Sequence, residues 1–214
     1  MKTAVIAGTL VDTRMGTELL EGHGLKAEGY PAGRTPTEQS LFQIGPAEER
    51  CATVGRLIEE GKRSGCSRVL IYCNSLSATL DVPALSKEHS IPVVTPMDVY
   101  GSYARKYSRL GVLTANSQGA SGIEKAMLAA SPGTIVFTAA NLALTQGIED
   151  GIPPEKLLET RGIGPLLTYF QTNGAEAVVL GCTHFPYIKE ALRKVSELPV
   201  LDPGEALPEL VRRA

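Results

Sequence analysis

The sequence has few cysteines, no excess of charge of either sign and no long hydrophobic run. Four cysteines in 214 residues are too few for a disulfide scaffold. No two are spaced as Cys-x-x-Cys, so a structural zinc site or a thioredoxin-type redox pair lacks local support. With 21 Lys and Arg against 23 Asp and Glu, the chain has no basic footprint for nucleic acid or anionic lipid. No stretch reaches the roughly 18 apolar residues that span a bilayer. We therefore expect no metal, no nucleic-acid partner and no membrane partner.

The first residues resemble a weak signal peptide but fit a buried strand better. The apolar run Ala4–Val11 is interrupted by Gly8 and Thr9 and leads into Asp12 without a small-x-small cleavage site. We therefore expect a cytoplasmic protein. A hydrophobic fraction of 43% with 21% charged residues is typical of a globular chain. The length suits one compact body or two small lobes.

Short apolar runs alternate with amphipathic stretches along the chain. The runs are continuous, which is the pattern of strands buried on both faces of a parallel sheet. Strand–helix alternation predicts an α/β fold with parallel sheets flanked by helices. The predicted strands contain Ala4–Ala7, Val69–Tyr72, Val93–Val94, Gly111–Leu113, Ile135–Phe137 and Val178–Leu180. The predicted helices span Glu48–Arg63, Ala78–Glu88, Met97–Tyr107, Gly122–Ala130, Glu155–Phe170 and Ile188–Glu197.

Two similar helix starts divide the chain. Thr35-Pro36-Thr37-Glu38 and Thr95-Pro96-Met97-Asp98 each place Thr as N-cap, Pro at the first helical position and an acid in the first turn. The second lies near the middle of the chain, and each half holds an apolar strand that ends in a cysteine. We therefore predict two pseudo-symmetric lobes, residues 1–96 and 97–197. We expect the tail, 198–214, to return to the first lobe.

Cys73 and Cys182 directly follow two of the predicted strands. In open parallel α/β sheets the ligand crevice lies beyond the carboxyl ends of the strands, where both cysteines fall. Small polar residues and a helix start follow each one, an environment that favours a thiolate or binds a carboxylate. We expect the active site in the cleft between the lobes. Cys51 and Cys66 lie in or beside a helix without a polar cluster and are expected to be structural.

The motifs Cys73-Asn74-Ser75 and Gly181-Cys182-Thr183-His184-Phe185-Pro186 resemble the paired signature of the cofactor-independent aspartate/glutamate racemase family. The resemblance covers most of the chain. Asp12-Thr13-Arg14-Met15-Gly16 stands where the family has an Asp-Ser-Gly-x-Gly loop after its first strand. Pro31-Ala32-Gly33 stands where glutamate racemases have Pro-Tyr-Gly, and Glu149 aligns with the glutamate of the family's Val-Glu-x-Gly segment.

The resemblance implies racemisation of an acidic amino acid by two-base proton transfer at Cα, without a cofactor. Cys73 would serve one enantiomer and Cys182 its mirror image, with Asp12 and His184 as assisting catalytic groups. Aspartate is slightly favoured over glutamate because the Pro-Tyr-Gly element is changed. The family also implies a possible homodimer. The expected substrate-binding residues are Thr13, Arg14, Ala32, Gly33, Asn74, Ser75, Thr183 and Glu149.

Two alternatives stay open. One is another member of the same superfamily, such as a hydantoin racemase or a maleate isomerase, although the motif at the second cysteine argues against these. The other is a carboxylate-binding protein that has kept the pocket and lost turnover, because the first loop departs from the family pattern at Thr13, Arg14 and Met15.

Overall fold

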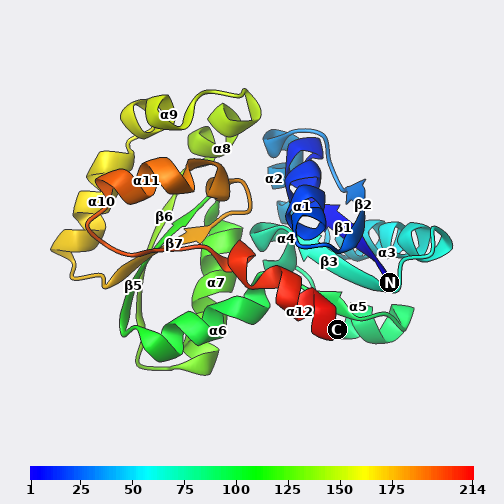
Figure 1. Ribbon diagram of the computed structural model, residues 1–214. Helices are drawn as coiled ribbons and strands as arrows, with labels where there is room; N and C mark the ends of the chain where they lie inside the picture. The colour runs from blue at the N-terminus through cyan, green and yellow to red at the C-terminus, as the bar shows by residue number, and fades with distance from the viewer.

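The computed structural model describes residues 1–214 and consists of two lobes side by side, each built on its own sheet (Figure 1). The first sheet has four parallel strands in the order β2-β1-β3-β4. Its strands are β1 (Lys2–Ala7), β2 (Lys26–Pro31), β3 (Arg68–Tyr72) and β4 (Val93–Val94). The helices of this lobe are α1 (Leu10–Gly22), α2 (Pro36–Ile44), α3 (Ala47–Arg63), α4 (Asn74–Ala78) and α5 (Val82–His89).

The second sheet repeats this plan, with four parallel strands in the order β6-β5-β7-β8. The predicted two-lobed α/β fold with parallel sheets is therefore confirmed. Its strands are β5 (Arg109–Thr114), β6 (Ile135–Ala140), β7 (Ala177–Gly181) and β8 (Val200–Leu201). Its helices are α6 (Met97–Lys106), α7 (Ser117–Ala130), α8 (Leu142–Glu149), α9 (Pro154–Thr160), α10 (Ile163–Thr172), the short 3-10 helix η1 (Phe185–Ile188) and α11 (Lys189–Val195). No helix is both long and apolar enough to cross a membrane.

The C-terminal tail belongs to both lobes. Strand β8 pairs with β7 in the second sheet, and a 3-10 turn, η2 (Pro203–Glu205), then leads into α12 (Leu207–Arg213). Helix α12 runs back along the first lobe (Figure 1), where Leu207 and Val211 are buried against Val5 and Leu70. The divisions at residues 96 and 197 stay proposals; β8 lies within the predicted tail but still pairs with the second sheet, and the chain crosses back to the first lobe after it.

Several predicted elements differ from those in the structure. The helix predicted over Ala78–Glu88 begins only at Val82, because α4 ends at Ala78 and Asp81 caps a new helix whose first turn contains Pro83. The helix predicted over Glu155–Phe170 is two helices, α9 and α10, which Gly162 separates with a left-handed φ of 69°. Strand β2 was missed because it is an edge strand without a continuous apolar run.

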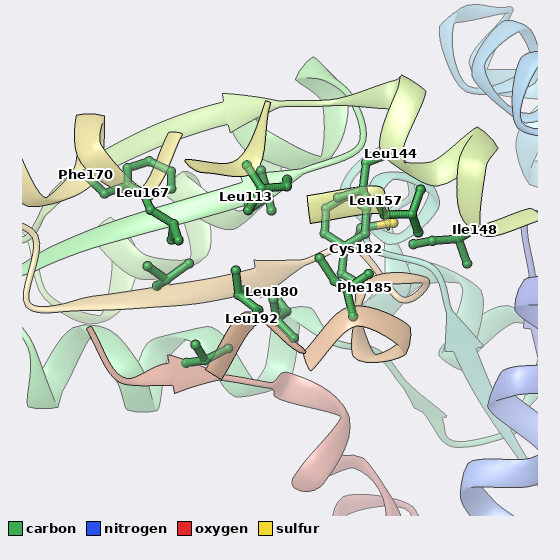
Figure 2. Packing of buried hydrophobic residues seen from close by; sticks show 14 of the residues in the cluster. Leu113, Leu144, Ile148, Leu157, Leu167, Phe170, Leu180, Cys182, Phe185 and Leu192 are labelled. Carbon is green, nitrogen blue, oxygen red and sulfur yellow. The ribbon is translucent and has the colours of Figure 1, made fainter. Parts of the chain in front are cut away.

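Each lobe has a hydrophobic core that ends beside one of the two strand-end cysteines. Cys73 belongs to the first-lobe cluster that contains Ile71 and Leu76. Figure 2 shows Cys182 with Leu144 and Leu157 at the end of the second-lobe cluster. The carbon atoms around both sulfurs are thus close-packed, which holds each side chain in place.

Helices α4 and α7 join the lobes through a contact that requires glycine. A Cβ added at Gly122 of α7 would lie 2.2 Å from the Cβ of Ala78 in α4. Because neither atom belongs to a flexible side chain, we expect Gly122→Ala to lower the free energy of unfolding by about 1–3 kcal/mol. Urea unfolding followed by circular dichroism measures this, with the uncrowded Gly133→Ala as the matched control. Equal loss in both variants would contradict the close contact.

Candidate active site

The two cysteines lie at equivalent places in the two lobes. Cys73 follows β3 and is the N-cap residue of α4, whereas Cys182 follows β7. Both are buried, with exposed fractions of 2% and 8%. Both line one cavity of about 10 Å³, which has room for about one water molecule. The fold therefore places two thiols that are distant in sequence around one small enclosed space.

On the second-lobe side, His184 lies between Cys182 and two carboxylates. Its Nδ1 is 3.7 Å from the sulfur of Cys182 and 3.7 Å from Oδ1 of Asp12. Its Nε2 is 2.7 Å from Oε1 of Glu149. Burial opposes the imidazolium, but the Asp12 charge and the hydrogen bonds to Cys182 and Glu149 outweigh it and raise the pKa of His184 well above its usual value. A charged imidazole in contact with a thiol can exchange a proton with it.

Asp12 is fully buried inside helix α1 rather than in a loop. Arg14 stands at the first glycine of the family's loop, whereas Gly16 keeps the second, and Thr9 caps the helix by accepting a hydrogen bond from the Asp12 amide at 3.1 Å. Burial raises the pKa of the Asp12 carboxyl, against the opposing charge of His184. The carboxylate lies near His184 and forms no hydrogen bond with Cys73, so its geometry suits holding the imidazole.

Glu149 ties the second lobe to the start of α1. Its Oε1 accepts a hydrogen bond from the Thr9 hydroxyl at 2.5 Å as well as contacting His184. Burial disfavours the Glu149 carboxylate, but the hydrogen bonds from His184 and Thr9 lower its pKa, and the charge of Arg14 adds to them. Arg14 is exposed and lies outside the cavity lining. The structure thus groups Asp12, Glu149 and His184 on the Cys182 side.

Cys73 has a different environment, made by two glutamines of α2. Its sulfur accepts a hydrogen bond from Nε2 of Gln39 at 2.9 Å and one from Nε2 of Gln43 at 3.7 Å, and the hydroxyl of Ser75 is 3.6 Å away. Burial, followed by the negative charge of Asp12, raises the pKa of Cys73 to about 12. At neutral pH this cysteine is therefore a thiol.

Sequence reasoning missed both glutamines. The capping box at Thr35 predicted a helix start, and residues 39 and 43 stand four positions apart, which places them on one face of that helix. Two glutamines four positions apart, just after a capping box, were the signal available in the sequence.

Three of the expected substrate contacts line the cavity. They are Asn74, Ser75 and Thr183, each next to one of the cysteines. Oδ1 of Asn74 accepts a hydrogen bond from the hydroxyl of Tyr100, and the hydroxyl of Tyr72 donates to the carbonyl of Thr183 at 3.3 Å. Both tyrosine contacts cross between the lobes and connect each cysteine-bearing turn to the opposite lobe.

The other five expected contacts lie outside the cavity lining: Arg14 and Glu149, described above, and Thr13, Ala32 and Gly33. The hydroxyl of Thr13 donates to the carbonyl of Thr9 at 2.6 Å, and its methyl group lies over Gly29 in β2. Ala32 packs against the first-lobe core. Gly33 approaches the backbone of Gly8, because a Cβ there would lie 2.9 Å from the Gly8 carbonyl oxygen. These three residues pack against neighbouring parts of the first lobe, and their contact with a substrate stays a prediction.

No group of three or more His, Cys, Asp or Glu side chains is placed to hold a metal ion. The groups that line the cavity include two thiols, which can exchange protons, and amides and hydroxyls, which can donate hydrogen bonds.

Comparison with known proteins gives consistent matches. The profile of the Asp/Glu/Hydantoin racemase family matches residues 36–211. A glutamate racemase of Pseudomonas aeruginosa is 27% identical over 173 residues, which cover 77% of this chain and 63% of that protein. The chain thus spans less than two thirds of the length of that relative.

Two solved structures share the fold. The glutamate racemase of Francisella tularensis in complex with D-glutamate superposes with a TM-score of 0.77 at 17% identity, covering 99% of this chain and 79% of that one. An aspartate racemase homologue from Pyrococcus horikoshii has a TM-score of 0.68 at 16% identity, covering 100% and 98%. The two-lobed fold, the paired cysteine motifs and the profile match over most of the chain together show that this protein belongs to the Asp/Glu/Hydantoin racemase family.

Proposed function

We propose that this protein racemises an acidic amino acid without a cofactor, using Cys73 and Cys182 as the two bases. The observation that carries the proposal is the pair of buried thiols that line one cavity from opposite lobes. Racemisation requires removal of a proton from one face of Cα and delivery of a proton to the other face. Two thiols on opposite sides of one carbon supply both.

The proton transfers balance within the site. One cysteine begins as thiolate and accepts the Cα proton, which leaves a carbanion, and the opposite thiol then donates its proton to the other face. The two sulfurs have exchanged protonation states, so each enantiomer is served by the cysteine that the other does not use. Asn74, Ser75 and Thr183 offer hydrogen-bond donors for the charge that develops on the substrate carboxylate.

Substrate entry requires the lobes to part. The cavity of about 10 Å³ is far too small for an amino acid, because it holds about one water molecule. Hydrogen bonds that cross the cleft close it, among them Thr9 to Glu149 at 2.5 Å and Asn116 to Gln43 at 3.1 Å. We infer that opening breaks these bonds and that closure around the substrate excludes water from the carbanion.

Aspartate is the first substrate to test, because Ala32 stands where glutamate racemases carry tyrosine. Proton NMR of the Cα–H signals of D- and L-aspartate and D- and L-glutamate in deuterium oxide, with enzyme and no added cofactor, tests the proposal. We expect both enantiomers of one amino acid to lose the Cα–H signal. Absence of exchange with all four would refute racemisation of acidic amino acids.

A carboxylate-binding protein that has lost turnover is the alternative from another class. Adding aspartate or glutamate would raise the free energy of unfolding of such a protein, yet the protein would exchange no Cα proton. A hydantoin racemase or maleate isomerase would act on its own substrate and leave all four amino acids unchanged. The homodimer and the cytoplasmic location stay predictions.

A further inference from the structure

The two sulfurs of the site have unequal surroundings. Cys182 contacts His184, which is backed by two carboxylates, whereas no cationic or basic side chain contacts Cys73. The titratable groups that act on Cys73 are Asp12 of α1 and Cys182 beyond β7, and both oppose a thiolate there. A Cys73 thiolate, which the two-base reaction requires in one direction, therefore depends on neutral hydrogen-bond donors.

The orientation of Gln43 follows from a backbone amide. The amide N–H of Gly119 in α7 donates to Oδ1 of Asn116 at 3.0 Å, which leaves Nδ2 of Asn116 as the donor to Oε1 of Gln43 at 3.1 Å. Nε2 of Gln43 then points at the sulfur of Cys73. Because a backbone N–H can only donate, this chain of bonds fixes which end of each amide faces its neighbour.

The same chain of bonds crosses the cleft. Gln43 lies on α2 of the first lobe, and Asn116 caps α7 of the second. The Gln43 amide is therefore oriented toward Cys73 by Asn116 only when the lobes are closed.

Gln39 can reach Cys73 because Gly8 has no side chain. A Cβ added at Gly8 would lie 2.0 Å from Nε2 of Gln39 and 2.1 Å from its Cδ. Gln39 is 8% exposed, and its amide lines the cavity in contact with the Cys73 sulfur at 2.9 Å. Glycine at position 8 thus makes the space in which this donor reaches the thiol.

We propose that Gln39 and Gln43 are positioning residues that stabilise the Cys73 thiolate through amide hydrogen bonds, in the way that His184 serves Cys182. The inference rests on the proposed function. When the Cys73 thiolate takes the Cα proton, an S–H bond forms as the Cα–H bond breaks, and the two amides lose an anionic acceptor. When Cys73 donates its proton in the reverse direction, the same amides receive the thiolate that is left.

The test is alkylation of the intact protein by iodoacetamide between pH 7 and 9, with each modified cysteine identified by peptide mass. Only a thiolate reacts, so the ratio of the Cys73 alkylation rate to the Cys182 alkylation rate reports the fraction of Cys73 that is thiolate. Both cysteines become accessible through the same opening of the cleft, so the frequency of opening cancels from the ratio. Gln39→Leu keeps most of the side-chain volume and removes the donor. We expect it to lower this ratio about tenfold, which corresponds to a rise of about 1 in the pKa of Cys73.

Gly8→Ala provides an independent variant, because it displaces the Gln39 amide without altering it, and the same fall in the ratio is expected. Gln171→Leu on α10, whose amide bonds the exposed Glu197, is the matched control and should leave the ratio unchanged. If Gln39 only covered Cys73, without stabilising the thiolate, Gln39→Leu would leave the Cys73 alkylation rate unchanged or raise it. An unchanged or increased ratio in Gln39→Leu therefore overturns the proposal.

Turnover gives a second readout. In Gln39→Leu we expect kcat for Cα exchange to fall about tenfold while KM changes less than about twofold, because the amide acts on the thiol. If the unaltered protein exchanges no Cα proton, the proposed function fails, whereas the alkylation ratio still decides whether the Gln39 amide stabilises the Cys73 thiolate.

Discussion

Replacing either Cys73 or Cys182 by serine is expected to lower the rate of racemisation by about 10²–10⁴-fold, the usual contribution of a positioned acid or base. Serine has nearly the shape of cysteine, but its hydroxyl is a much weaker acid and supplies no anion at neutral pH. Both residues are buried at the cavity, so the substitution changes the chemistry and preserves the packing. Polarimetry of each enantiomer, with NMR exchange in deuterium oxide, measures the loss.

The other two cysteines provide matched controls. Cys51 is exposed on α3 and Cys66 is buried in the first-lobe core, away from the cavity. Serine at Cys51 should leave activity unchanged, and serine at Cys66 should affect stability rather than kcat. Retention of full activity in Cys73→Ser or Cys182→Ser would show that the missing residue is not one of the two bases.

Removing the His184 imidazole is expected to destabilise the folded protein by about 3–5 kcal/mol, because it leaves the buried Asp12 carboxylate without its charge partner. The variant His184→Gln should also lose most Cα exchange, since no group then passes a proton to or from Cys182. Urea unfolding at neutral pH measures the stability, and the double variant Asp12→Asn, His184→Gln should recover a large part of the loss.

The same pair predicts a pH dependence of stability. The pKa of His184 is raised in the folded protein, against burial, by Asp12, Cys182 and Glu149, and burial raises the pKa of Asp12. The folded state thus binds protons more tightly than the unfolded chain at both sites, so both contributions are lost as pH rises. For His184 the stabilisation is complete below about pH 6.5, the pKa of an unfolded histidine. It disappears as the pH rises through the raised pKa of His184 in the folded protein.

Unfolding free energy measured from pH 6 to pH 10 should therefore fall in the unaltered protein more steeply than in the double variant. A parallel decline in both proteins would mean that other groups carry the pH dependence. A rise with pH in the unaltered protein would contradict the direction of the His184 shift.

Local patterns in the sequence were enough for much of the fold. The continuous apolar runs at Val69–Tyr72 and Val178–Leu180 became the buried central strands β3 and β7, each of which ends at a cysteine. Edge strand β2 and the helix break at Gly162 were not predictable in this way. An exposed edge needs no apolar run, and an isolated glycine within an amphipathic stretch does not reveal its φ.

The candidate site divides along the same line. The two strand-end cysteines and their polar neighbours could be found from the residues alone, because parallel strands present their carboxyl ends at one edge of a sheet. Which groups act on which thiol depends on the packing of the folded chain, which places Asp12 with His184, and Gln39 and Gln43 with Cys73. Those contacts join residues from different elements, and in part from different lobes. Local patterning carries no information about such pairs, since they form only when elements distant in the sequence pack together.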